Sequence, residues 1–133
     1  MTIKIGVPKE TLEGERRVAV VPSILKQLVG KSGSITGQLK QLGKLGVEVL
    51  LEQGAGVDSG FADGDYEDAT LVDGADALYA QADVVLKVQP PSVEEAAKLK
   101  EGSLLIGFLA PHQSDELIKV LQQRRVTALA MEL

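Results

Sequence analysis

Short, uninterrupted runs of Val, Ile and Leu recur along the 133-residue chain, separated by polar stretches that carry glycine or proline. Because the apolar residues in each run are continuous rather than alternating, the pattern favours strands that are covered on both faces, as in a parallel sheet. The predicted strands span residues 3–7, 47–51, 83–88, 103–108 and 126–131.

The segments between these runs carry helical patterns. Pro22 stands where a proline opens a helix, and Ser92 is placed to cap a helix whose first turn is acidic. The predicted helices span residues 22–28, 73–82, 92–99 and 114–125. Strands that alternate with helices predict one α/β domain over residues 1–133, with three layers and a mostly parallel sheet of the Rossmann-like or flavodoxin-like kind.

Composition narrows the classes of function. The formal net charge is −5 and Lys and Arg do not cluster, which argues against a nucleic-acid partner. With no cysteine and His112 as the single histidine, disulfides and thiolate catalysis are excluded and no metal site is expected. No apolar run approaches the roughly 18 residues of a membrane span, so we expect a cytoplasmic domain without direct membrane insertion.

Two features are unusual for a compact domain. "LKQL" occurs at residues 25–28 and again at 39–42, and the glycines between the copies favour two helical pieces around a flexible loop. The chain also ends in the apolar strand "VTALAMEL", whose faces and edge need cover. We therefore expect a sheet that is incomplete at the C-terminus and a protein that continues beyond residue 133.

Two glycine-bearing stretches resemble nucleotide-binding loops without matching them. "GKS" at residues 30–32 has Leu25 where a phosphate-binding loop needs glycine. "GAGVDSG" at residues 54–60 has the spacing G-x-G-x-x-x-G and no helix directly after it, which differs from a dinucleotide fingerprint. The second stretch predicts a tight turn after a strand.

Three side chains could carry chemistry, each with a plainer alternative. Lys87 ends an apolar strand, where it is either a ligand group at the strand's carboxyl end or a side chain that extends to water. Arg17 either binds a carboxylate or phosphate or lies in a solvated loop. His112 precedes a helix and is either a general base or an exposed histidine without a role.

Six strings in order resemble the N-terminal domain shared by alanine dehydrogenases and the alpha subunit of proton-translocating NAD(P) transhydrogenase. The resemblance covers nearly the whole chain. The strings are "IKIGVPKE", "GERRVAVVP", "GVEVLLEQGAG", "ADVVLKVQPP", "GFLAPHQSDEL" and "VTALAMEL".

The same resemblance separates the two branches of the family. Alanine dehydrogenases hold pyruvate with an arginine, a lysine and a histidine from this domain. Arg17 matches the arginine, but Gln89 stands at the lysine position and Ala110 at the histidine position. Neither replacement supplies a cation or exchanges a proton. The transhydrogenase pattern F-x-x-P-x-Q is met from Phe108 to Gln113, which favours that branch.

The resemblance implies a supporting first domain that is inactive alone. NAD(H) would bind mainly to a second domain beyond residue 133, absent here, and NADP(H) to a partner subunit, with hydride transfer coupled to proton translocation. It implies no catalytic, cofactor-binding or metal-ligating residue within this chain. Arg17, Lys87 and Gln89 are the expected substrate- or cleft-facing residues. Expected partners are a second copy, in a homodimer, and membrane-embedded and NADP-binding subunits, which would hold the domain at the cytoplasmic side of the membrane.

Residues 29–42 resemble an insertion, since deleting them leaves "VPSILKQLGKLGVEV", which is close to the family's usual helix and strand. Two other functions stay open. One is an alanine dehydrogenase-like domain that acts on 2-oxo acids, and the other is a non-catalytic, stand-alone interaction module.

Overall fold

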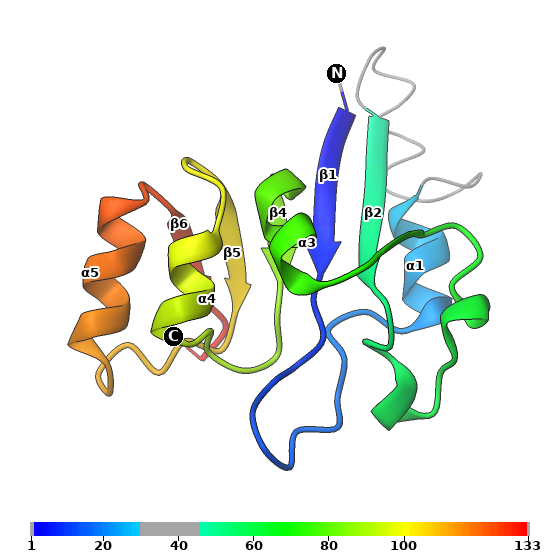
Figure 1. Cartoon of the computed structure of the whole chain (residues 1–133), viewed down its shortest axis with the longest axis horizontal. Helices are drawn as coiled ribbons and strands as arrows, with labels where there is room; N and C mark the ends of the chain where they lie inside the picture. Colours follow the sequence, from blue (N-terminus) through cyan, green and yellow to red (C-terminus); the bar gives the residue numbers. More distant parts are fainter. Residues whose placement is uncertain (1, 30–45, 133) are drawn as a thin grey trace.

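The computed structural model describes residues 2–29 and 46–132 of the chain (Figure 1). Within these ranges, six strands form one sheet in the order β3-β2-β1-β4-β5-β6, and every neighbouring pair is parallel. This is the strand order of a doubly wound, Rossmann-like sheet. The strands are β1 Thr2–Val7, β2 Gly46–Glu52, β3 Thr70–Val72, β4 Val84–Leu86, β5 Leu104–Gly107 and β6 Thr127–Ala130.

The helices lie where the sequence pattern predicts them: α1 Pro22–Leu28, α3 Ala75–Gln81, α4 Val93–Lys98 and α5 Asp115–Gln123. Two short 3₁₀ helices, Val57–Ser59 and Asp63–Asp65, follow β2. Ser92 caps α4 as predicted, because its hydroxyl accepts from the Glu95 N–H at 3.1 Å and the Glu95 carboxylate accepts from the Ser92 N–H at 3.2 Å. None of the helices in the described ranges is both long and apolar enough to cross a membrane.

Helices cover both faces of the sheet, which confirms the three-layer prediction. On one face α3, α4 and α5 bury Leu78, Ala96 and Leu117 against Leu50 and Val85 of the strands. On the other face α1 buries Leu25 against β1 and β2, and Tyr66 completes that cluster. The two clusters take alternate residues of β2, so its apolar run is explained by burial on both sides.

The α1 face is not covered along its whole width. Beyond β1 it continues over β4, β5 and β6, where Phe108, Leu129 and Met131 have 42%, 50% and 63% of their surface exposed. Figure 1 shows α1 beside β2, at the opposite end of the sheet from β5 and β6. Among the residues that the structure describes, this apolar strip has no helix above it.

The sequence pattern missed β3 and extended β4 too far. The three residues of β3 follow an acidic stretch and are too few to show a strand period, yet they pair with Leu50 to Glu52 of β2. β4 ends at Leu86 rather than at residue 88. Lys87 still donates its N–H to Ile106 O at 3.0 Å, but the next two N–H groups turn to a side chain.

The glycines after β2 confirm the predicted turn. Gly54 and Gly60 have φ values of +80° and +87°, which glycine adopts at little cost. A Cβ on Gly56 would lie 2.6 Å from the hydroxyl oxygen of Tyr66. Backbone geometry and packing therefore account for all three glycines. "GKS" and, apart from Val29, the proposed insertion at residues 29–42 lie outside the described residues.

Gly6 lies in β1 under α3 and gives the first testable prediction. A Cβ at Gly6 would lie 2.8 Å from both Ala82 Cβ and Leu78 Cδ2. We expect Gly6→Ala to lower the free energy of unfolding by about 1–3 kcal/mol through overpacking. Urea denaturation measures this. Gly64→Ala is the control, because nothing lies within 4 Å of that position. Equal stability of the two variants would contradict the packing described here.

Candidate functional site

The candidate site lies at the carboxyl ends of β1 and β4. These strands are neighbours in the sheet, but the chain leaves β1 towards β2 on one side and continues from β4 towards β5 on the other. Such a switch in direction opens a crevice where doubly wound sheets bind ligands. The loop of residues 8–21 after β1 lies at this end of the sheet (Figure 1).

Lys87 directly follows β4 and is buried, with 5% of its surface exposed. Its Nζ lies 3.4 Å from both carboxylate oxygens of Glu10 and 3.5 Å from Oε2 of Glu95. A buried ammonium requires such partners, because desolvation of an unpaired charge is costly. The side chain therefore does not extend to water, which contradicts one of the two alternatives that the sequence left open.

Glu10 also receives the backbone of the turn after β4. Its Oε1 accepts from the Gln89 N–H at 2.8 Å, and its Oε2 accepts from the Val88 N–H at 3.3 Å. After β4 ends, the Val88 and Gln89 N–H groups no longer donate to a neighbouring strand. The Glu10 carboxylate accepts their hydrogen bonds instead. Sequence reasoning gave Glu10 no role. The sequence feature that pointed to such a residue was Lys87 in an apolar run, because a buried lysine requires a carboxylate partner. It did not show where along the chain that partner lies.

Glu95 balances the other side of the lysine. Its Oε2 accepts from the Tyr79 hydroxyl at 2.8 Å, and its Oε1 accepts from Thr11 Oγ1 at 3.0 Å. Burial opposes ionisation of Glu95, but the charge of Lys87 and these hydrogen bonds outweigh it, so its pKa lies below the ordinary value. Burial, together with the negative charge of Glu95, raises the pKa of Tyr79 far above its usual range.

Arg17 and Gln89 are brought together by Glu15. Arg17 donates from Nε to Glu15 Oε1 and from Nη2 to Glu15 Oε2, both at 2.9 Å, in a bidentate pair. The Gln89 amide donates to Glu15 Oε2 at 2.6 Å. The Arg17 guanidinium and then the Gln89 amide hold the pKa of Glu15 well below its usual range. The Arg17 side chain remains 63% exposed, whereas that of Glu15 is 6% exposed.

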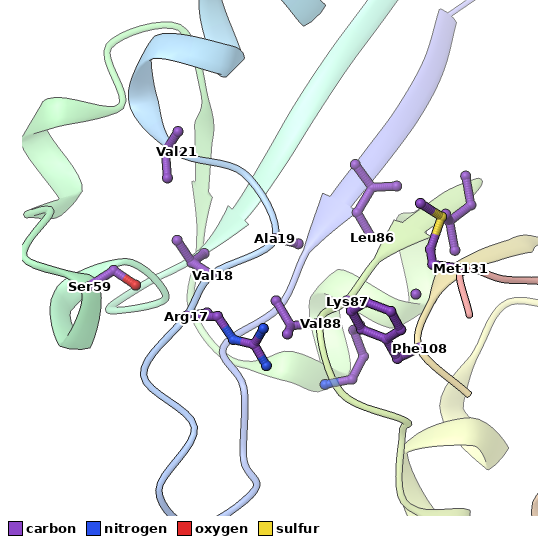
Figure 2. A pocket seen from close by; sticks show the side chains of 12 residues that line it. Arg17, Val18, Ala19, Val21, Ser59, Leu86, Lys87, Val88, Phe108 and Met131 are labelled. Atoms are coloured by element: carbon purple, nitrogen blue, oxygen red, sulfur yellow. The ribbon is translucent and has the colours of Figure 1, made fainter. Parts of the chain in front are cut away.

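A pocket of about 410 Å³ opens between the loop after β1 and the ends of β4 and β5 (Figure 2). Most of its lining is apolar, from Val18, Leu86, Ile106, Phe108 and Met131. Figure 2 shows the Lys87 ammonium directed away from Phe108 and Met131. The lining residues that the structure describes include no carboxylate or imidazole, and the polar residues among them are Arg17, Ser59 and Lys87.

Gly107 allows the end of β5 to approach this site. A Cβ at Gly107 would lie 2.4 Å from the carbonyl oxygen of Lys87, so only glycine fits against that backbone. The turn after Gly107 is held by Glu132, whose carboxylate accepts from the N–H groups of Leu109 at 3.0 Å and Ala110 at 3.2 Å. Ala110 has a left-handed φ of +44°, and Glu132 fixes this strained turn from the end of β6.

His112 lies apart from this network. His112 is exposed in the turn before α5. Gln89 also lines a second recess of about 310 Å³, which it shares with Thr11, Lys87 and Glu95 of the network. In residues 2–29 and 46–132, no three His, Cys, Asp or Glu side chains are grouped closely enough to hold a metal ion.

Removal of the Lys87 charge gives the second prediction. Lys87→Met leaves the Glu10 and Glu95 carboxylates buried without their cation, and we expect it to lower the free energy of unfolding by about 3–5 kcal/mol. Lys98→Met is the control, since Lys98 pairs with Asp76 at 2.7 Å on the exposed surface and such pairs contribute less than about 1 kcal/mol. Urea denaturation of both variants compares them. Similar losses would contradict the role of buried charge.

The lowered pKa of Glu95 gives the third prediction. A carboxyl group whose pKa is depressed in the folded state adds stability at pH values above its unfolded pKa, and this stability is lost as the pH falls through the folded value. We expect the free energy of unfolding to fall as the pH drops below the ordinary value of 4.5, and to fall less steeply in Glu95→Gln. Glu94→Gln, an exposed change in the same helical turn, should keep the wild-type profile. An unaltered slope in Glu95→Gln would contradict the expectation.

Comparison with known proteins finds relatives of the two kinds that the sequence strings resemble, transhydrogenase alpha subunits and alanine dehydrogenases. The chain is 37% identical to the NAD(P) transhydrogenase subunit alpha of Cereibacter sphaeroides, over 98% of the chain and 23% of that protein. A transhydrogenase structure from Sinorhizobium meliloti superposes with a TM-score of 0.77 at 31% identity, over 97% of the chain and 35% of that structure.

An L-alanine dehydrogenase structure matches equally well, with a TM-score of 0.77 and 31% identity over 96% of the chain and 32% of that structure. The chain thus spans a third or less of the curated relatives and about a third of these structures. Residues 6–133 match the family model described as "Alanine dehydrogenase/PNT, N-terminal domain". With nearly all of its length inside that match, the chain belongs to the family of alanine dehydrogenase and PNT N-terminal domains.

Proposed function

We propose that this chain forms the N-terminal part of an NAD(P) transhydrogenase alpha subunit and supports hydride transfer between NAD(H) and NADP(H), coupled to proton translocation. The observation that carries the proposal is the state of Gln89. It stands where the alanine dehydrogenase pattern has a pyruvate-binding lysine, and its amide donates to Glu15 at 2.6 Å. A substrate carboxylate at this position would find no cation beside Arg17. It would find the neutral Gln89 amide, which is already hydrogen-bonded to the Glu15 carboxylate.

The nucleotide would bind mainly outside this chain. The sequence has no G-x-G-x-x-G fingerprint, and the glycines after β2 serve a turn. In this proposal a second domain, encoded beyond residue 133, holds NAD(H), and a partner subunit holds NADP(H). The 133-residue chain supplies one wall of the cleft between the domains and has no hydride-transfer activity by itself.

Arg17, Lys87 and Gln89 have different parts in that wall. Arg17 lines the pocket with an exposed guanidinium, which suits it to face the nucleotide-binding domain. Gln89 binds the loop after β1, because its amide donates to Glu15. Lys87 contributes its charge from beneath the surface, by neutralising Glu10 and Glu95. The complete subunit would form a homodimer and lie at the cytoplasmic side of the membrane through its membrane-embedded partners.

The apolar strip over β4 to β6 agrees with a larger protein. Phe108, Leu129 and Met131 are exposed beside the pocket. Large apolar side chains gathered at one place usually mark a surface that another segment or partner covers. In the proposed subunit, a distal segment of the same chain returns to this domain and covers the strip.

A second candidate function is an alanine dehydrogenase-like oxidoreductase acting on 2-oxo acids. It is supported by the equal TM-scores of the two classes of structure, and by Arg17, which stands at the position of the substrate-binding arginine. Against it, Gln89 supplies no charge and Ala110 supplies no group that exchanges a proton. The geometry favours the transhydrogenase assignment.

The complete product of the reading frame gives the fourth prediction. We expect the frame to continue past codon 133 into a glycine-rich fingerprint. We expect the purified product, combined with its partner subunits, to transfer hydride from NADPH to an NAD⁺ analogue. It should not oxidise NADH in the presence of pyruvate and ammonia, because the carboxylate clamp lacks two of its three groups. Absorbance assays of both reactions measure this.

The outcomes separate the candidates. NADH oxidation that requires pyruvate and ammonia would establish the second function and overturn the first. A stop codon directly after codon 133 would contradict both and support an interaction module. The matched control is Gln89→Ala in the complete product, which removes the amide and adds no cation, so it should gain no activity with pyruvate.

A further inference from the structure

Glu10 lies where two separate parts of the chain meet. It follows β1, yet its carboxylate accepts N–H groups from Val88 and Gln89, which lie 78 and 79 residues further along the chain. Its side chain is 2% exposed. A residue with this burial and this number of partners fixes the position of whatever it binds.

The hydrogen bonds from the Val88 and Gln89 N–H groups to the Glu10 carboxylate determine where the Gln89 side chain points. Two successive N–H groups on one carboxylate set the orientation of the peptide units on both sides of Val88. Gln89 then extends from a fixed backbone, and its amide nitrogen reaches Glu15 Oε2 at 2.6 Å. Lys87 holds the same carboxylate from below and neutralises its charge.

Glu15 passes this constraint to Arg17. The oxygen that accepts from Gln89 also accepts from Arg17 Nη2 at 2.9 Å, and the other oxygen accepts from both the Nε and the backbone N–H of Arg17. Arg17 is largely exposed, and an exposed arginine samples several rotamers unless its guanidinium is held. Two of its five N–H groups are used on Glu15, and the others remain for the pocket that it lines.

We propose that Glu10 is a positioning residue that orients the pocket-lining Arg17 through Gln89 and Glu15. Glu10 does not contact Arg17 by a hydrogen bond in the described network, and acts through the turn after β4. The proposal rests on the geometry of residues 10–17 and 87–89 and not on the hydride-transfer proposal. It therefore stands or fails in the 133-residue chain itself.

Motion of the Arg17 Nε–H bond tests this relay, and gives the fifth prediction. In the wild-type chain we expect a backbone-like NMR order parameter of about 0.85 for this bond, because Glu15 holds it. Glu10→Ala and Gln89→Ala should each lower it to below about 0.6, the range of flexible groups. Glu13→Ala, an exposed glutamate of the same loop, is the matched control and should leave the order parameter unchanged.

Glu10→Gln covers the case in which Glu10→Ala fails to fold. It keeps one oxygen for the Gln89 N–H but presents an NH₂ group to Val88 N–H or Lys87, so we expect a partial loss of order at Arg17. Gln89→Ala leaves no buried charge unpaired and tests the relay independently. Folding of each variant is checked from the amide spectrum of β3 and α5, which make none of the contacts of this network.

A double-mutant comparison separates a relay from a direct effect on the loop. If Glu10 acts through Gln89, then Glu10→Gln lowers the order of Arg17 in the wild-type background and has no further effect in the Gln89→Ala background. That result would support the proposal. A further loss of order in the Gln89→Ala background, or a rigid Arg17 in folded Glu10→Gln and Gln89→Ala chains, would overturn it.

Discussion

The buried ammonium of Lys87 is the interaction on which the cleft end of this domain depends. It lies between Glu10 from the loop after β1 and Glu95 from the first turn of α4, at 3.4 and 3.5 Å. The loop after β1 is thus joined to the end of β4 and the start of α4 at the point where the sheet changes direction. Two carboxylates and one ammonium would leave excess negative charge, and donors from Tyr79, Thr11 and the backbone offset it.

The close backbone packing around Lys87 makes this arrangement specific. Gly107 brings the end of β5 against the Lys87 carbonyl, and this close approach holds the backbone from which the lysine side chain extends. From there the side chain reaches the two carboxylates of Glu10 and Glu95. Charge pairing and backbone packing support each other here, since the buried pair needs fixed distances and the packing provides them.

Much of the fold could be predicted from local patterns, because strands with both faces covered and capped helices leave a signal within ten residues. β1, β2, β5 and α5 are examples. β3 could not be found, since its three residues become a strand only by pairing with β2. The sequence proposed Lys87, Arg17 and Gln89 as cleft-facing residues but not the carboxylates that join them. Glu10 and Glu15 reach Gln89 across 79 and 74 residues, and no local pattern encodes such contacts.

The positions on which the proposed choice between the two branches rests differ in kind from those that build the charged network. Gln89 and Ala110 lie in turns after β4 and β5, and both are partly exposed. A change there alters which groups face the cleft and leaves no buried charge unpaired. A change at Glu10 or Lys87 would break a pair whose side chains are each 2% exposed. Under that proposal one scaffold carries different chemistry at modest energetic cost, because the residues that differ lie in the turns and the charged network lies beneath them.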